Sequence, residues 1–493
     1  MRAPAIPACL LGAGILITIL AWPQLTAAPD EGRLVQVHVT RQIQNPFLPW
    51  QHGAPAPIVG YGYFINETQV LTTENLVRNH RLVELLRPKT GDKITAVVEI
   101  ADHMLNLAIL RIADVAQSDG ERTIQTAGKL PLGTPLTILQ FDGDRNIQNC
   151  DAKITQIGVT RLPGAPYSLL SYRLLSGLDV NGEGAPVIHD GTLAGVIMSY
   201  QSSTRVAIML SEPFLSRFIT DTREPPYLGP ASAGFFWRSL VDPAKRKYLR
   251  LGERTGGIQV VAPLRGTPGG KALHPLDVIL SWDGHALDNL GFYKDPHFGR
   301  LQFSHLIHGT RSPGDLVSLT VFRDGREQAV ELRLAGDPDA SALVPENVTR
   351  KPAQYLVAGG LIMRDLDVNY MRSLGGDWRS RIDSRLLHFY LSSRDRDYDP
   401  GDRVVVLVGV LPDRINVDYQ QHVNQVIETV NGQAVRNMGD VFRIVDADGN
   451  LLRIRLKGGG VDLVFDEHEL REANRRIQSQ YQIPALRRQQ PER

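Results

Sequence analysis

Cysteine is scarce in this chain of 493 residues, and charge of neither sign dominates. Only Cys9 and Cys150 are present, which excludes a disulfide-rich scaffold. Lys and Arg number 54 against 53 Asp and Glu, so no charge excess favours nucleic acid or an anionic membrane as a partner. The 13 histidines form no His-Glu-x-x-His motif, and no Gly-Lys-Ser/Thr phosphate loop occurs. The sequence therefore predicts no metal, no cofactor and no nucleic-acid ligand.

Long hydrophobic runs are also missing, apart from one at the N-terminus. Arg2 precedes an almost unbroken apolar run from Cys9 to Trp22, and small residues follow it. A run of this length is typical of a secretory signal, being short for a membrane span of about 20 apolar residues. The cleavage site is imperfect, which leaves an uncleaved N-terminal anchor as the alternative. We expect residues 1–28 to be a signal peptide or anchor and the remainder to be exported.

Glycine and proline are abundant, at 45 and 31 residues, and they separate many short apolar runs. Between residues 30 and 222 this spacing predicts an all-β barrel or sandwich. The expected strands are Leu34–Val39, Tyr63–Ile65, Gln69–Leu71, Ala96–Ile100, Leu107–Ile112, Leu136–Leu139, Ile154–Val159, Pro186–Ile188 and Leu193–Met198. Glu212–Ile219 is expected to be a closing helix, and Pro225-Pro226 marks a domain boundary.

Two further segments are expected to mix strands with helices. Residues 223–336 contain a strand pair, Leu316–Phe322 and Gln328–Leu334, whose connecting Asp324-Gly325 is a strong hairpin signal. Phe303–His308 in the same segment suits a helix. Residues 337–350 have the composition of a linker.

The last segment, 351–493, repeats the order of the second one weakly. Strands are expected at Val404–Leu411, Val426–Val430 and Leu451–Leu456, and helices at Asn437–Val445 and Asp466–Gln480. The Asn431-Gly432 pair predicts a tight turn within this repeat.

Four local patterns in the first segment together resemble the HtrA/Deg group of exported trypsin-like serine proteases. They are Gly60–Ile65, Val70–Val77, Asn106–Leu110 and Asn181–Pro186. The resemblance implies a trypsin-like double β-barrel in which the catalytic histidine, aspartate and serine positions are held by Asn75, Asn106 and Glu183.

These three substitutions remove each role that serine proteolysis needs. Asn75 cannot act as a base, and neutral Asn106 cannot stabilise an imidazolium. Glu183 offers no hydroxyl nucleophile and places a carboxylate where an oxyanion would have to be held. We therefore expect an inactive protease fold. The open alternative is a displaced catalytic site, for which Asp102, His80, His103 and Ser176 are the nearby candidates.

The second and third segments resemble the PDZ domains of the same family, so the whole fold is expected to be mainly β, with two PDZ-like α+β domains after the double barrel. The first likeness rests on Tyr227-Leu228-Gly229, which the resemblance implies as peptide-binding residues. Pro230 departs from the pattern because proline has no N–H for a terminal carboxylate. PDZ domains bind an extended peptide as an added strand.

The resemblance favours an exported, periplasmic pseudoprotease that binds peptides or unfolded proteins and so takes part in protein quality control. Partners implied by the family are an active Deg-type protease and further copies in a trimer, for which Phe47 and Trp50 are candidate contacts. Two alternatives stay open: an active serine endopeptidase with a displaced site, and a purely structural exported scaffold.

Overall fold

The computed structural model describes residues 31–87, 90–113, 124–162, 165, 167–336, 342–346, 352–392, 398–399, 401–447, 449–458 and 460–489. The expected signal or anchor, residues 1–28, lies outside this part of the chain. Among the described residues, no helix is both long enough and apolar enough to span a membrane.

The first domain begins with a closed barrel of six antiparallel strands in the order β1-β2-β3-β6-β5-β4. Alternate residues of β1 point into it, and Val35, Val37 and Val39 are at most 2% exposed. The elements are η1 (Glu31–Arg33), β1 (Leu34–Arg41), β2 (Ala56–Phe64), β3 (Gln69–Thr72), α1 (Glu74–Val77), β4 (His80–Leu86), β5 (Lys93–Asp102) and β6 (Leu107–Ile112).

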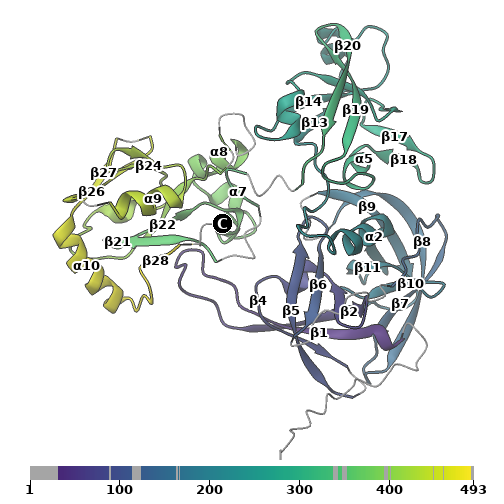
Figure 1. Ribbon diagram of the computed structural model, residues 1–493, viewed down its shortest axis with the longest axis horizontal. Coiled ribbons are helices and arrows are strands. Elements are labelled where there is room, and N and C mark those ends of the chain that lie inside the picture. The colour runs from purple at the N-terminus through teal and green to yellow at the C-terminus, as the bar shows by residue number, and fades with distance from the viewer. Residues whose placement is uncertain are drawn as a thin grey trace, which may run out of the picture.

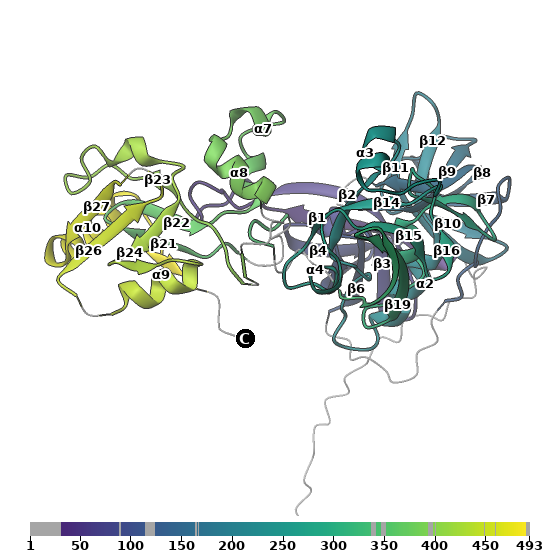
Figure 2. The same ribbon diagram turned by 90° about the horizontal axis from the view of Figure 1, so that it is seen from above.

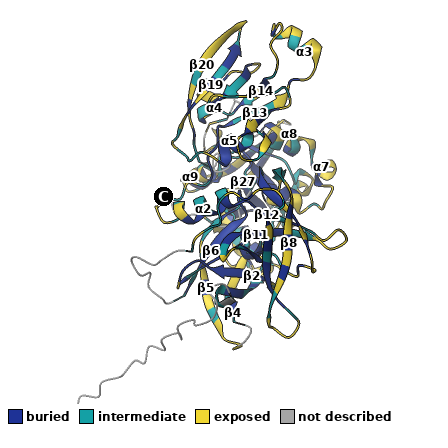
Figure 3. Ribbon diagram, turned by 90° about the vertical axis from the view of Figure 1, so that its right-hand side faces the viewer, coloured by how far each residue is buried: buried dark blue, intermediate teal, exposed yellow. Residues whose placement is uncertain are grey.

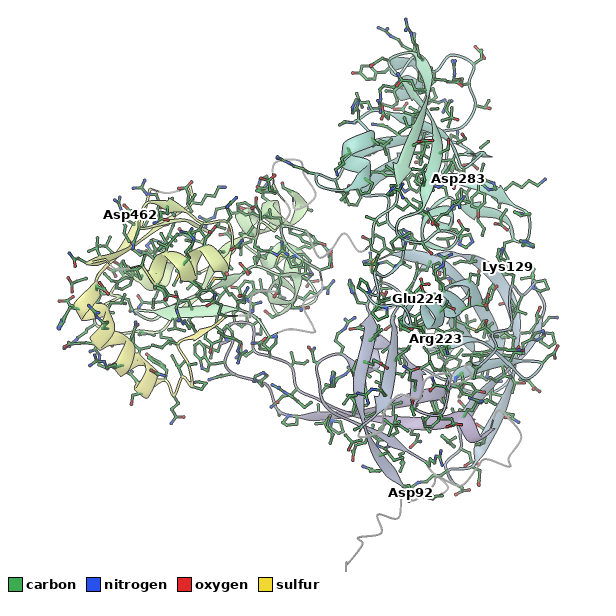
Figure 4. The ribbon with its side chains drawn as sticks, in the orientation of Figure 1. Asp92, Lys129, Arg223, Glu224, Asp283 and Asp462 are labelled. Carbon is green, nitrogen blue, oxygen red and sulfur yellow. The ribbon has the colours of Figure 1, made fainter. Side chains whose placement is uncertain are left out.

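A second closed barrel follows, in the order β10-β11-β12-β9-β8-β7, and the two barrels lie side by side (Figure 1). Its elements are β7 (Pro135–Phe141), β8 (Ile147–Arg161), β9 (Ser168–Ser176), β10 (Pro186–His189), β11 (Thr192–Gln201), β12 (Val206–Leu210) and the closing helix α2 (Glu212–Asp221). The strands β4, β9 and β12 were not predicted. Polar residues interrupt the apolar runs of β4 and β9, whereas β12 is an uninterrupted apolar run. Arg223 and Glu224 mark the end of this domain in Figure 4.

The second domain is built on one antiparallel sheet in the order β13-β14-β15-β19-β20, and β16 pairs with β15. Asp324 and Gly325 turn the predicted β19–β20 hairpin with φ of 51° and 81°. The elements are β13 (Phe235–Ser239), α3 (Pro243–Tyr248), β14 (Ile258–Pro263), α4 (Pro268–Ala272), β15 (Val278–Trp282), β16 (His285–Ala286), β17 (Phe292–Asp295), β18 (Gly299–Gln302), α5 (Ser304–His308), β19 (Leu316–Arg323) and β20 (Arg326–Arg333).

The third domain contains two four-stranded sheets, β23-β22-β21-β28 and β25-β24-β26-β27. In the second of these sheets, Asp462 of β27 forms an ion pair with Arg455 of β26 at 2.9 Å (Asp462 is labelled in Figure 4). The elements are β21 (Tyr355–Ala358), β22 (Leu361–Asp365), α6 (Val368–Arg372), α7 (Trp378–Arg381), α8 (Ser384–Ser392), β23 (Val405–Val410), η3 (Tyr419–His422), β24 (Ile427–Val430), β25 (Gln433–Ala434), α9 (Met438–Val445), β26 (Leu451–Leu456), β27 (Asp462–Asp466), α10 (Glu467–Gln480) and β28 (Arg487–Arg488). The predicted order of a double barrel and two α+β domains is confirmed.

One boundary differs from the prediction. Leu343 and Val344, placed in a linker on composition, are 3% and 1% exposed and belong to the core of the third domain. The carbonyl of Pro345 accepts a hydrogen bond from the N–H of Val368 at 3.1 Å. The third domain therefore begins before residue 351, because this apolar pair is buried against it.

The second domain is attached to the second barrel through a continuous hydrophobic core (Figures 1 and 2). The third domain has a separate core and is in contact with the rest through the loop after β1 and an ion pair of Arg265 with Asp399 at 2.9 Å. Tyr172 of β9 and Phe298, between β17 and β18, have ring centroids 6.4 Å apart. Figure 3 shows buried strands such as β2 and β11 within the barrels, and exposed surface at α3 and β20. The first two domains thus form one packed body.

Candidate functional site

The structure brings Asn75, Asn106 and Glu183 together between the two barrels. Asn75 lies in α1, whose N-cap Thr73 accepts the N–H of Leu76 at 3.4 Å. Asn106 directly precedes β6 with a φ of 54°, a left-handed conformation that asparagine tolerates better than most residues. Glu183 lies in the loop that enters β10.

Hydrogen bonds join all three side chains. The Nδ2 of Asn75 donates to one carboxylate oxygen of Glu183 at 2.8 Å, and the Nδ2 of Asn106 is 3.5 Å from the other. The backbone N–H of Asn75 donates to the Oδ1 of Asn106 at 2.7 Å. Asn106 is fully buried, while Asn75 and Glu183 are half-buried. The Glu183 carboxylate thus accepts two amides from the first barrel, so the cluster fastens the two barrels together.

The loop that carries Glu183 is fixed by its backbone. The carbonyl of Glu183 accepts the N–H of Tyr61 at 2.9 Å, and the N–H of Gly184 donates to Ile197 at 2.9 Å. Gly184 has a φ of +81°, and a Cβ there would lie 2.5 Å from the Tyr61 carbonyl oxygen. Glycine is therefore required beside Glu183 on both conformational and steric grounds.

A backbone donor needed for an oxyanion hole is already used. In trypsin-like sites the hole is formed by the N–H of the nucleophile and that of the residue two positions earlier. Here that earlier residue is Asn181, and its N–H donates to Oε1 of buried Gln140 at 3.1 Å. Its side chain is also held, because Nδ2 donates to the Phe141 carbonyl at 2.8 Å and Oδ1 accepts the Tyr61 hydroxyl at 2.6 Å.

The contacts that Asn181 makes with Gln140 and Tyr61 were not predicted from the sequence. Gln140 and Asn181 are 41 residues apart, and no local pattern pairs them. Tyr61 and Asn181 both lie within patterns noted above, but nothing in those patterns indicates that they touch.

Charged residues near the cluster have partners of their own. Glu74, 3% exposed, forms an ion pair with Arg78 at 2.5 Å. Burial lowers the pKa of Arg41, which the nearby Glu183 carboxylate partly offsets. The Nε of Arg41 donates to the carbonyl of Leu76 at 3.2 Å.

The candidates for a displaced catalytic site have structural contacts of their own. Ser176 is 3% exposed, and its hydroxyl donates to the Leu178 carbonyl at 2.6 Å. One carboxylate oxygen of Asp102 accepts the N–H groups of Met104 and Leu105, and the other accepts the Tyr227 hydroxyl. The ring Nδ1 of His80 is 2.8 Å from the Val77 carbonyl oxygen. His103 also has an interaction partner. Within the described ranges, no group of three metal-ligating side chains is found.

The residues predicted to bind peptide lie at the junction of the first two domains. The Tyr227 hydroxyl donates to Asp102 at 2.5 Å, and its ring contacts Phe218 edge-on at 5.6 Å. Leu228 is 54% exposed, and Gly229 is adjacent to Asp102. These contacts place the tripeptide before the sheet of the second domain, not on a strand of it.

The edge of that sheet nearest in sequence to this tripeptide is β13. It pairs with β14 on one side only, in the described part of the chain. Its residues are half-buried or exposed, and Trp237 packs edge-on against Phe303, just before α5, at 5.0 Å. An extended peptide could add to this strand by main-chain hydrogen bonds.

Comparisons with known proteins find similar sequences and solved structures. Residues 344–489 match the family described as "PDZ domain". Two similar proteins of Arabidopsis thaliana are the chloroplastic protease Do-like 2 (23% identical, covering 84% of this chain and 67% of the relative) and the mitochondrial protease Do-like 4 (22% identical, covering 92% and 84%). Similar solved structures include the "HtrA-type protease AlgW with decapeptide" (18% identical, covering 63% of this chain and 97% of that one, TM-score 0.47). A serine endoprotease from Yersinia pestis is 13% identical, covers 63% and 96%, and has a TM-score of 0.42.

Two closed six-stranded barrels with a polar cluster between them, followed by two α+β domains of which the last matches a PDZ domain, define a trypsin-like protein with a PDZ module. Within that class, the chain is similar to the HtrA/Deg-type trypsin-like proteases with PDZ domains.

Proposed function

We propose that this chain is a pseudoprotease that holds peptides or unfolded segments without cleaving them. The observation that carries the proposal is the hydrogen-bonded cluster of Asn75, Asn106 and Glu183. Acyl transfer to a side chain needs a nucleophile, a base and an orienting carboxylate, and this cluster contains no hydroxyl, thiol or imidazole. A peptide carbonyl placed beside Glu183 would meet a carboxylate, which repels the negative charge of a tetrahedral intermediate.

Occupation of the Asn181 N–H supports the same proposal. A developing oxyanion would have to compete with Gln140 for this donor. Such a preformed bond works against catalysis, because oxyanion stabilisation depends on donors that are aimed at the transition state beforehand.

Peptide binding is assigned to the second domain, at β13. An added strand would bond through its main chain, which supplies affinity, and the half-buried Phe235, Phe236 and Trp237 favour apolar side chains in the peptide. The early apolar run, Cys9–Trp22, supports export, for which a periplasmic setting is proposed.

Amide hydrogen exchange tests the binding assignment in the intact protein. The probe is a pool of extended peptides with apolar C-termini, and exchange is followed with and without it. We expect protection of β13 and none of β20, the opposite edge of the same sheet, which serves as an internal control. Protection of neither edge, or of β20 alone, would refute binding at β13.

A further inference from the structure

A single loop of the first barrel reaches the third domain. This anchor loop, residues 42–53, lies between β1 and β2 and extends toward β21 and β28 (Figure 1). It is internally braced: Oδ1 of Asn45 accepts the N–H groups of Phe47 and Leu48 at 3.0 and 3.2 Å. The N–H of Asn45 donates across the loop to the Gln51 carbonyl at 2.9 Å. The loop is therefore a shaped element with a defined tip.

Two aromatic rings at the tip pack against the third domain. Trp50 is 7% exposed and belongs to the core of that domain, with its ring centroid 5.8 Å from that of Tyr355. Phe47 meets Tyr370 edge-on at 5.3 Å. Phe47 stays 36% exposed, so Trp50 supplies most of the buried apolar area, and edge-to-face geometry is favourable for aromatic pairs.

Polar groups of the third domain bind the backbone of the same tip. Nη1 of Arg364 donates to the Pro46 carbonyl at 3.1 Å, and Nη1 of Arg488 is 3.4 Å from the Pro49 carbonyl oxygen. The N–H of Ala353 donates to Oε1 of Gln44 at 3.2 Å.

The Arg364 side chain is buried in the third domain and fixed by hydrogen bonds. It is 3% exposed, and its other N–H groups are held by Asp367 and by the carbonyl of Asp365. A buried guanidinium is tolerated when its donors are paired, and here the backbone of another domain completes the set.

We propose that the third domain carries a recognition surface for a Pro-Phe-x-Pro-Trp segment, and that the chain's own anchor loop fills it. The surface is formed by Tyr355, Arg364, Tyr370 and Arg488, and thus by β21, β22, α6 and β28. It is distinct from β13 of the second domain, and the inference does not depend on the proposed peptide binding there. Two rings three positions apart supply the apolar contact, and the carbonyls of the two prolines accept from the arginines.

Emptying the surface tests the proposal in the intact chain. In the variant Phe47→Ala/Trp50→Ala the two rings are removed, whereas Ile43→Ala changes an apolar residue of the same loop that is 64% exposed. The probe is a fluorescent peptide with the sequence of residues 44–52. We expect it to bind the double variant at least tenfold more tightly than the native chain or Ile43→Ala, since the surface is occupied in both.

The same peptide with both aromatics changed to alanine should not bind. Circular dichroism establishes that the double variant keeps its fold, and X-ray scattering should show an increased radius of gyration for it alone. Equal peptide binding by all three proteins, or none by a folded double variant, would overturn the proposal. If the native chain forms oligomers and the double variant does not, the loop fills the surface of a neighbouring copy. That result would overturn the assignment of the loop to the surface of its own chain.

Discussion

Glu183 determines what the cluster between the barrels can do. Its carboxylate is an acceptor only, and the two amides that meet it are donors, so the three side chains satisfy one another. Each of the three positions thus contributes to one self-consistent polar contact. Hydrogen bonds to a charged group are stronger than neutral ones, which gives this contact a role in holding the barrels together.

Exchange of donor and acceptor tests this contact. Asn75→Asp places a second carboxylate against Glu183 and should lower the free energy of unfolding by about 1–3 kcal/mol at neutral pH. Adding Glu183→Gln should restore most of the loss, because the glutamine amide can then donate to the new aspartate. Urea unfolding of both variants checks this, and a double variant as unstable as Asn75→Asp would contradict the pairing.

The helix α5 joins the second domain to the second barrel and brings two histidines into the contact. His305 is 2% exposed against Phe214, and His308 is 8% exposed against Tyr167. Burial lowers the pKa of His305 to about 4. The Asp295 carboxylate opposes this shift, while Lys129, Arg217 and His308 add to it. Lys129 lies on the second barrel (Figure 4). Burial also lowers the pKa of His308.

Acid should therefore weaken this contact. Both histidines are neutral when packed, so stability is complete above the unfolded pKa of about 6.5 and is lost as the pH falls toward 4. For His305 alone the loss between pH 7 and pH 5 is about 2 kcal/mol. We expect His305→Gln to reduce this pH dependence in the opening free energy of α5, measured by hydrogen exchange. His468→Gln, at an exposed site in α10, is the control, and equal slopes in both variants would contradict the argument.

Capping alone does not explain which helices were predicted. The helices α2 and α5 were predicted although they have no side-chain N-cap bond, whereas α1, α3 and α4 have one and were not predicted. The helices α9 and α10 begin directly after Asn437 and Asp466, whose side chains accept the first free N–H groups. By contrast, α6, α7 and α8 were not predicted, although Asp367 caps α6 in the same way. These helices are short, and arginines and glycines between them interrupt the apolar period, so packing of residues such as Leu386 and Phe389 determines them.

At the scale of the whole molecule, the order of domains could be predicted because each has its own local patterns, but contacts between domains could not. The cluster of Asn75, Asn106 and Glu183 was inferred from a family resemblance at each position, and the structure places the three side chains together. The bond from Asn181 to Gln140, the contact of Tyr227 with Asp102, and the anchor loop all depend on distant residues. Their partners are set by the assembled fold.

The measurement that tests the central claim most directly is degradation of an unfolded model protein by the purified mature chain, with a serine-reactive probe in parallel. The account predicts neither cleavage nor labelling, because the cluster of Asn75, Asn106 and Glu183 contains no hydroxyl, thiol or imidazole, and Gln140 occupies the Asn181 N–H. A Glu183→Gln variant serves as the control. Cleavage by the native chain, whether or not this variant retains it, would contradict the account.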